Sequence, residues 1–535
     1  MITQSIIFVL WLLQIVGQVL RWTYWLQVKE YRLDRFFVFF KTKLGKRELG
    51  ILGILGKLGL MLCCLYFRSF SILVLGVFLL LDFKVIEEIW GRRLRKPVFT
   101  QRARRMLGTT VFLFLLTFLF FGVNLQSLLF GEVLFLTGPF LGIAWTISVV
   151  NKAKKREIAK AKKRLEKIQP KVIGITGSYG KGTTKDFLAH LLLQKFSVEK
   201  TVGSQNTEFG IARKAQKIKK DAEFFIVEMG AYKRGEINNL CKIVNPEIGI
   251  ITGIEEQHLA LFGSLENIKK AKFELVENLP RNGVVFFNFN NTHCRWLAKK
   301  AKKLSTNPKV MGFYFQNVGS SKAIKTDMVS KLISVNTDGV VFEIEEKGNR
   351  QIISAPLHGI HFVENLTGAI LVARYLGVNW KQIKKNCKTI KAPRKTMQVY
   401  KIGKAVVVDD TFNNTPEGFE AALSYLSLYK KQKKVVITPG IIELGNESVK
   451  VHKKLGKIMS SFVDKIVFTN DDLVSAVEVG LGGNKHKLTV ETNSDKLVKA
   501  VSELVNENYV FLLEGRLPSV LMDCFDSEMR NVLEH

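Results

Sequence analysis

Hydrophobic and polar positions divide this chain of 535 residues into two regions. Up to about residue 150, long apolar runs occur at residues 5–20, 50–67, 70–83, 107–123 and 133–150, and every second connection between them is basic. From Lys171 onward, apolar runs of strand length alternate with charged segments of helical period. The first pattern is typical of helices that cross about 30 Å of hydrocarbon. The second is typical of a parallel sheet covered by helices.

The long apolar runs predict an N-terminal membrane domain over residues 1–150, with about five spans. The second and third runs could instead form a re-entrant hairpin, because Lys57 interrupts one and the other is short. Lysine and arginine are concentrated at 21–47, at 84–105 and after residue 150, and basic connections tend to remain in the cytoplasm. We therefore expect a multi-pass protein of the cell membrane, with its N-terminus outside and its catalytic domains in the cytoplasm.

The net charge of +33, from 80 basic and 47 acidic residues, changes this picture little. Many basic residues flank the apolar runs and no nucleic-acid-binding motif accompanies them, so we expect membrane lipid and no nucleic acid as a partner. Residues 151–170 predict a basic linker helix, either solvated or attracted to anionic lipid. The six cysteines form no C-x-x-C pair, which argues against structural zinc and suits a reduced compartment.

The second region predicts two α/β domains, at residues 171–391 and 392–535. Strands are expected at 172–176, 223–228, 248–254 and 284–289, followed by an antiparallel excursion at 310–355 and a helix at 363–376. A change of pattern at Lys391-Ala-Pro-Arg394 precedes further strands at 405–408, 435–438, 465–468 and 510–513. The predicted fold class is therefore a multi-span helical domain, a central P-loop domain and a Rossmann-like C-terminal domain.

The stretch Gly177-Ser-Tyr-Gly-Lys-Gly-Thr-Thr184 connects an apolar strand to a helix. Bare backbone N–H groups in such a turn can close around phosphate oxygens, with Lys181 as the counter-charge. The loop is two residues shorter between its glycines than the general Walker pattern. A glycine-rich turn that binds nothing is the alternative, but the order of strand, lysine, hydroxyls and helix favours a nucleotide. The predicted ligands are Gly177, Ser178, Gly180, Lys181, Gly182, Thr183 and Thr184.

Short G-x-x-G-K loops resemble those of the Mur ligase superfamily and its folylpolyglutamate synthase relatives. Further motifs in the same order are similar to MurF, the D-alanyl-D-alanine-adding branch, and cover about 171–460. These motifs are Asn206-Thr-Glu-Phe-Gly210, Phe225-Ile-Val-Glu-Met-Gly-Ala231, Ile251-Thr-Gly-Ile-Glu-Glu-Gln-His-Leu-Ala-Leu-Phe-Gly-Ser264, Ile268-Lys-Lys-Ala-Lys-Phe-Glu274, Leu357-His-Gly-Ile-His361, Val408-Asp-Asp-Thr-Phe-Asn413 and Glu443-Leu-Gly445.

The resemblance implies an ATP- and Mg²⁺-dependent ligase that activates a carboxylate as an acyl phosphate for attack by an amine. Lys181 would bind the terminal phosphates. The implied metal ligands are Thr183 (or Thr184), Glu228, His258 and Lys272, the last as a carbamate. Nucleotide contacts would come from His361, Asn365 and Asn413, and substrate contacts from Asn206, Asp409 and Asp410.

Simpler alternatives exist for several of these residues. A lone histidine such as His258 is usually a hydrogen-bonded structural residue. Lys272 could belong to a solvated helix face, and the Asp409–Asn413 segment could be a turn with local side-chain caps. The order and spacing of the motifs favour the catalytic interpretation.

The sequence departs from the family at several places. Gly182 stands where most Mur ligases have a metal-binding Ser or Thr, Thr396 replaces an arginine, and Phe412 replaces a tyrosine. The predicted membrane domain takes the place of the usual domain that binds UDP. The acceptor could therefore be a soluble nucleotide-linked precursor held differently, or a lipid-linked one.

We interpret the chain as a membrane-anchored ligase of peptidoglycan precursor synthesis, acting on a muramyl peptide and an amino acid or dipeptide. A polyglutamate-type synthase is the second enzyme hypothesis, favoured by Gly182. A non-catalytic ATP-binding scaffold for cell-wall enzymes is a third, although the combination of Lys181, Glu228, His258 and Lys272 argues for catalysis.

Overall fold

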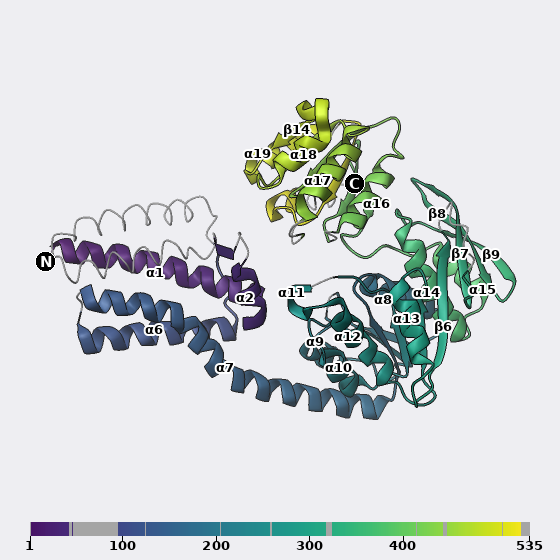
Figure 1. Cartoon of the computed structure of the whole chain (residues 1–535), viewed down its shortest axis with the longest axis horizontal. Coiled ribbons are helices and arrows are strands. Elements are labelled where there is room, and N and C mark those ends of the chain that lie inside the picture. Colours follow the sequence, from purple (N-terminus) through teal and green to yellow (C-terminus); the bar gives the residue numbers. More distant parts are fainter. Residues whose placement is uncertain are drawn as a thin grey trace. The chain divides into compact units, whose positions relative to one another are not determined.

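The computed structural model of the chain is shown in Figure 1. It describes residues 2–41, 45–46, 95–122, 125–203, 205–256, 259–316, 324–412, 415–441, 444, 447–505 and 507–525. Two compact units are present, one of residues 1–159 with 258–263, and one of residues 160–257 with 264–535.

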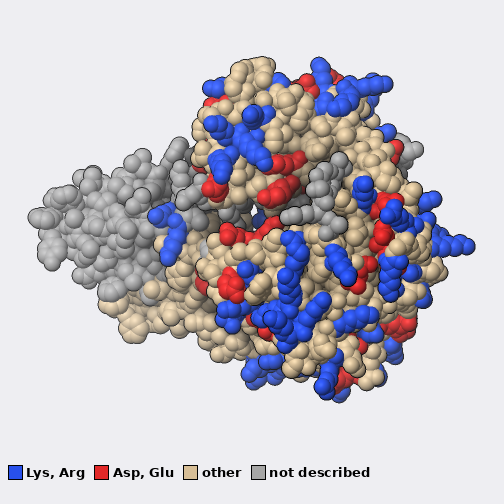
Figure 2. Space-filling view, turned by 45° about the vertical axis from the view of Figure 1, so that its right-hand side comes forward, with Lys and Arg blue, Asp and Glu red and all other residues tan. Residues whose placement is uncertain are grey.

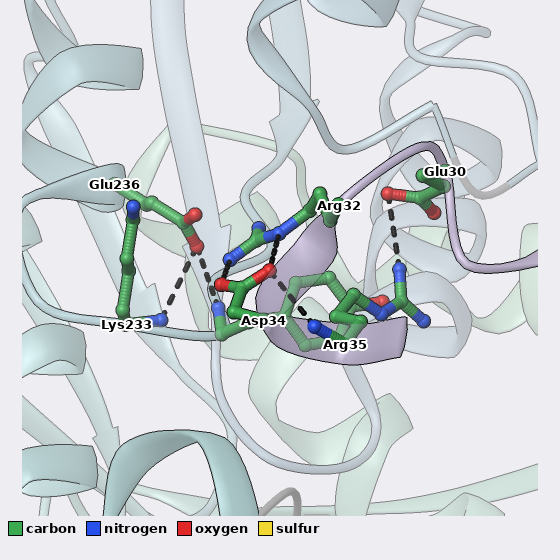
Figure 3. A network of polar contacts seen from close by, with 7 residues as sticks. Glu30, Arg32, Asp34, Arg35, Lys233 and Glu236 are labelled. Carbon is green, nitrogen blue, oxygen red and sulfur yellow. Dashed lines mark hydrogen bonds and ion pairs between the residues drawn. The ribbon is translucent and has the colours of Figure 1, made fainter. Parts of the chain in front are cut away.

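The first unit is helical where it is described. Its helices are α1 Ile2–Val28, α2 Leu33–Lys41, α6 Gln101–Phe121, the short α11 Leu259–Phe262 and the first part of α7 Leu125–Ile168. Aromatic side chains join α1 to α6, where Trp11 makes edge contacts with Phe114 and Phe118. At the α2 end, Arg32 forms an ion pair with Asp34, and Arg35 with Glu30 (Figure 3).

The prediction of a multi-pass membrane protein is wrong. Among the described helices, only α6 is long and apolar enough to cross a membrane, by length and composition alone. One such helix does not make a multi-pass domain. The predicted runs at 50–67 and 70–83 lie outside the described residues. The predicted run at 133–150 and the linker helix at 151–170 are parts of one continuous helix, α7.

The second unit contains a mixed sheet in the order β2-β3-β1-β4-β5-β6-β7-β8-β9. Pairing is parallel from β2 to β7 and antiparallel from β7 to β9. The strands are β1 Lys171–Thr176, β2 Val198–Lys200, β3 Phe224–Glu228, β4 Ile248–Ile251, β5 Val284–Asn288, β6 Lys309–Gln316, β7 Met328–Asn336, β8 Gly339–Glu346 and β9 Asn349–Ala355.

Helices cover both faces of the parallel strands, because these strands are apolar on both sides. On one face, Ile173 and Ile175 of β1 belong to a buried cluster with α8 and α14. On the other, a Cβ at Gly174 would lie 2.9 Å from Leu275 of α12, so only glycine allows this approach. The helices of this part are α8 Lys181–Leu192, α9 Glu208–Gln216, α10 Glu236–Val244, α12 Leu265–Glu277, α13 Thr292–Ala301, α14 His361–Tyr375 and α15 Trp380–Cys387.

A second sheet has the order β10-β11-β15-β12-β13-β14. All its pairings are parallel except that of β10 with β11. Its strands are β10 Gln398–Ile402, β11 Ala405–Asp410, β12 Lys433–Thr438, β13 Lys465–Phe468, β14 Leu488–Val490 and β15 Tyr509–Glu514. Its helical segments are α16 Pro416–Leu426, α17 Ser448–Ser460, α18 Val474–Leu481, η3 Gly482–Lys487 and α19 Ser494–Val505.

The two sheets confirm the α/β class that the sequence predicts after residue 170. On the face shown in Figure 2, Lys and Arg side chains lie among Asp and Glu side chains over the surface that is not grey. The short β2 was not expected, since Val198-Glu-Lys200 has no apolar run.

A buried hydroxyl pair attaches α14 to the sheet. Ser330 Oγ on β7 lies 2.7 Å from Thr367 Oγ1 on α14, and both residues are fully buried. Thr367 Oγ1 also donates to the carbonyl of Val363 at 2.6 Å. Its single proton is therefore committed, and Ser330 is the donor of the pair.

Replacing Thr367 by valine should lower the free energy of unfolding by about 2 kcal/mol, because the Ser330 proton loses its buried acceptor. Ser330→Ala should cost only about 1 kcal/mol, since the Thr367 proton keeps its partner. Urea denaturation measures both, with the exposed Ser502→Ala as the control. Equal costs for the two variants would contradict this assignment of donor and acceptor.

Candidate nucleotide and metal site

The turn from β1 into α8 has the geometry of a phosphate-binding loop. Gly177 approaches Thr252 so closely that a Cβ there would lie 2.2 Å from Thr252 Oγ1. Gly180, with φ +72°, caps the start of α8, and a Cβ there would lie 2.4 Å from Asn365 Oδ1. Glycine is needed at both positions. The N-terminus of α8 therefore opens onto a turn of bare backbone, where an anion is favoured.

Hydrogen bonds from the strand end of β4 hold this loop in place. Thr252 Oγ1 donates to the carbonyl of Tyr179. Ser178 Oγ donates to the carbonyl of Glu255 at 3.1 Å, and the Glu255 amide donates back to Ser178 Oγ at 3.0 Å. The side chain of Ser178 therefore stabilises the conformation of the loop. Its predicted contact with a nucleotide stays a prediction.

Lys181 begins α8 and folds over the loop. Its Nζ donates to the carbonyls of Gly177 at 2.8 Å and Ser178 at 3.0 Å. Burial lowers the pKa of Lys181, and the nearby Glu228 partly opposes that shift. Neither carbonyl neutralises the ammonium charge, so the lysine is available to an anion in the loop.

Glu228 lies at the carboxyl end of β3, next to β1, and is buried. Its Oε2 forms an ion pair of 2.9 Å with Lys185 Nζ, one turn into α8. Its Oε1 accepts a hydrogen bond of 3.1 Å from Asn206 Nδ2. A Cβ at Gly182 would lie 3.4 Å from Glu228 Oε2. Glu228, Asn206 and the loop are therefore together in the structure.

Lys272 is buried on α12 rather than on a solvated helix face. Burial, and then the charge of Lys181, lowers the pKa of Lys272 to about 7. Glu236 and Glu274 act in the opposite direction, but both are already engaged by backbone amides. Glu236 accepts from Tyr232 and Lys233 (Figure 3), and Glu274 from Gly235 and Asn238. A large fraction of Lys272 is therefore a neutral amine at pH 7.

The start of α14 lies against the loop. Asn365 Oδ1 lies 3.3 Å from Thr184 Oγ1, and Asn365 Nδ2 donates to the carbonyl of His361 at 3.2 Å. Because Thr184 is directed to Asn365, Thr183 is the better candidate for a hydroxyl ligand of the metal. Burial lowers the pKa of His361 to about 4, so its ring is neutral. Neither ring nitrogen has a hydrogen-bond partner among the described residues.

Three carboxyl groups gather at the carboxyl ends of β11 and β15. Asp409 Oδ1 accepts from the amide of Thr411 at 3.0 Å, and Asp410 Oδ1 from the amide of Met397 at 3.0 Å. Glu514 pairs with Asp410 across the two strands and is fully buried. Burial, followed by the charges of Asp410 and Asp409, raises the pKa of Glu514 well above its ordinary value. Burial and these neighbouring charges therefore favour the neutral form of the Glu514 carboxyl group.

Several site predictions lie beyond what the structure describes. His258 and Asn413 are outside the described residues, as is Glu443. Within the described part of the chain, no three His, Cys, Asp or Glu side chains are grouped so as to hold a metal. Phe412 is exposed and Thr396 is buried, and Arg394 is exposed at the surface.

Sequence reasoning missed two charged residues of these clusters. Lys185 could have been found from the sequence, because it lies four residues after Lys181 and therefore on the same helix face. Glu514 could not have been found in this way, because it ends an apolar strand outside the motifs that resemble the family in the sequence analysis.

The residues present fit a nucleotide with a divalent cation. The loop offers backbone space that any Cβ would fill, and the buried ring nitrogens of His361 are polar groups that a ligand could engage. The carboxylate of Glu228 and the neutral amine of Lys272 suit a hard cation, the latter only after conversion to a carbamate.

Comparison with known proteins matches two family models. Residues 175–373 match the Mur ligase middle domain, and residues 397–517 match the Mur ligase, glutamate ligase domain. The UDP-N-acetylmuramoyl-tripeptide–D-alanyl-D-alanine ligase of Bacillus subtilis is 27% identical over 380 residues, which are 69% of this chain and 79% of that protein.

Solved structures agree with these matches. A crystal structure of MurF from Acinetobacter baumannii superposes with a TM-score of 0.60 at 25% identity, covering 70% of this chain and 79% of that one. The MurF ligase of Thermotoga maritima in complex with ADP gives a TM-score of 0.57 at 24% identity, covering 71% and 84%. At that identity the second likeness shows the fold alone.

Burial of Lys272 should make stability depend on pH. An unfolded lysine titrates near 10.4, whereas the folded pKa is about 7. The cost of burying the charge is therefore complete below pH 7 and disappears as the pH rises toward the unfolded value. In buffer free of carbon dioxide, Lys272→Met should raise the free energy of unfolding more at pH 6 than at pH 9.5, by on the order of 2 kcal/mol. The control is Lys270→Met, which is exposed on the same helix. A gain independent of pH would contradict the lowered pKa.

Proposed function

We propose that this chain, which belongs to the Mur ligase family and is an ATP-dependent ligase of that type, joins D-alanyl-D-alanine to a muramoyl tripeptide in peptidoglycan precursor synthesis. The amide bond would form between the terminal carboxylate of the tripeptide and the amine of the dipeptide. The similarity to ligases with this named activity supports the substrates.

One observation carries the proposal. The glycine loop with Lys181, the carboxylate of Glu228 and the buried Lys272 are brought to one edge of the sheet, at the ends of β1 and β3 and on α12. Ligands of open α/β sheets bind at the carboxyl ends of the strands, so this is the expected edge. If the cluster were only structural, there would be no need for the Lys181 ammonium to be hydrogen-bonded to two neutral carbonyls, those of Gly177 and Ser178.

The roles of the residues follow from their charges. Bound ATP would supply the phosphoryl group that makes the acceptor carboxylate reactive. Lys181 would place a positive charge at the phosphates, where negative charge grows during transfer. Glu228, Thr183, the carbamate of Lys272 and His258 would hold Mg²⁺, with Asn206 orienting Glu228. His361, Asn365 and Asn413 would contact the nucleoside, and Asp409 and Asp410 would bind the incoming amine.

A polyglutamate-type synthase is the second candidate, because Gly182 replaces the hydroxyl that most Mur ligases have after the lysine. The two activities differ in acceptor and in donor, so product analysis separates them directly.

The purified chain should convert UDP-N-acetylmuramoyl tripeptide, D-alanyl-D-alanine and ATP to the pentapeptide product and ADP, measured by liquid chromatography and mass spectrometry. Lys181→Ala should lower kcat/KM by roughly 100-fold or more, because a fixed cation at the developing charge is lost. Lys195→Ala, an exposed lysine just beyond the same helix, should have no effect. Glutamate addition to a folate acceptor, without pentapeptide formation, would favour the second candidate and contradict the first.

Lys272 should carry a carbamate in the presence of carbon dioxide, because its neutral amine can attack CO₂ and lose a proton. With ¹³C-labelled bicarbonate, the protein should show a carbamate carbonyl resonance by ¹³C NMR, and Lys272→Met should lack it. The exposed neighbour Lys270→Met should keep the resonance. The same resonance in wild type and Lys272→Met would place the modification elsewhere.

A further inference from the structure

The negative charge of Glu228 is already neutralised by Lys185, a residue with no role in the proposed function. Lys185 Nζ lies 2.9 Å from Glu228 Oε2, and the two side chains are 1% and 7% exposed. The same ammonium donates to the carbonyl of Gly203 at 2.7 Å. Lys185 on α8 therefore contacts both the Glu228 carboxylate and the segment that follows β2, and it holds the carboxylate in position.

The second oxygen of Glu228 is also engaged. Asn206 Nδ2 donates to Oε1 at 3.1 Å, while the Glu228 backbone amide donates to Thr201 Oγ1 at 3.1 Å. Gly182 adds no side chain on the Oε2 side, where its Cβ would be 3.4 Å away. A cation that approaches Glu228 Oε2 therefore meets the ammonium paired with that oxygen, where burial of both side chains limits screening by solvent.

We propose that Lys185 is a resident counter-cation of Glu228, which makes the site reject a free divalent cation and accept one only together with a nucleotide. This inference rests on the proposed nucleotide site. Lys185 forms an ion pair with Glu228, and the side chain of Lys181, on the same helix, is near enough to feel the charge of this carboxylate. A free divalent cation would add positive charge beside these lysines, which is unfavourable. The phosphates of a nucleotide bring negative charge that offsets it. Lys185 is thus a positioning and selectivity residue that acts through Glu228.

The test measures binding, without turnover. Mn²⁺ replaces Mg²⁺, and the loss of the free-ion EPR signal gives its affinity for the full-length protein alone. With saturating ADP, the Mn²⁺–ADP complex measured in protein-free samples is subtracted, so that the affinity refers to metal held by the protein–nucleotide complex. Wild type should bind Mn²⁺ at least ten-fold more tightly with ADP than without it. Lys185→Met should bind free Mn²⁺ at least ten-fold more tightly than wild type does, because Glu228 loses its internal cation.

Matched controls separate charge from packing. Lys185→Arg keeps the charge and should resemble wild type. Lys214→Met removes the lysine of another partly buried pair, with Glu199, away from the loop, and should change neither affinity. If Lys185→Met does not fold, as judged by circular dichroism, Lys185→Gln replaces it, since the amide keeps a donor to Glu228 without the charge.

The outcomes are distinct. Unchanged or weaker binding of free Mn²⁺ in a folded Lys185 variant would overturn the inference, as would wild-type affinity that is equal with and without ADP. Both results leave the nucleotide site standing if ADP binds. Failure of wild type to bind ADP with any metal would instead overturn the proposed function.

Discussion

The turn from β1 into α8 is the constraint on which the rest of the site depends. Gly177 and Gly180 must approach Thr252 and Asn365 at distances that no side chain allows. This contact fixes the start of α8, and with it the direction of Lys181 toward the loop and of Lys185 toward Glu228. One backbone turn therefore sets the positions of the two lysines of α8 near the predicted nucleotide.

Charges in this part of the chain are buried at a cost to stability. Lys185 and Glu228 offset that cost by pairing, with Asn206 satisfying the remaining oxygen. Lys272 and Glu514 respond differently, since burial moves the pKa of each toward its neutral form. Buried groups with altered protonation are more common at functional sites than in structural cores, so these costs are consistent with catalysis.

Much of the α/β part could be predicted from local pattern. The apolar runs before Gly177 and around Glu228 each have strand length, and the glycine-lysine loop identifies the phosphate site. The sequence could not show that Lys185 lies beside Glu228, because that contact joins residues 43 positions apart. It also could not show that Glu514 faces Asp410, since strand order depends on packing rather than on local preference. The multi-pass prediction was wrong because an apolar run is not by itself a helix of spanning length and composition, and among the described helices only α6 is long and apolar enough to cross a membrane.

The contact of Asn365 with Gly180 and Thr184 joins segments about 180 residues apart. Sheet strands β2 to β9 are all made between these segments. During synthesis the glycine loop leaves the ribosome long before α14 does, and distant contacts of this kind form late. The nascent chain should therefore acquire its ligand site as one of the last events in maturation of this domain, so that the complete site exists only once the whole sheet is in place.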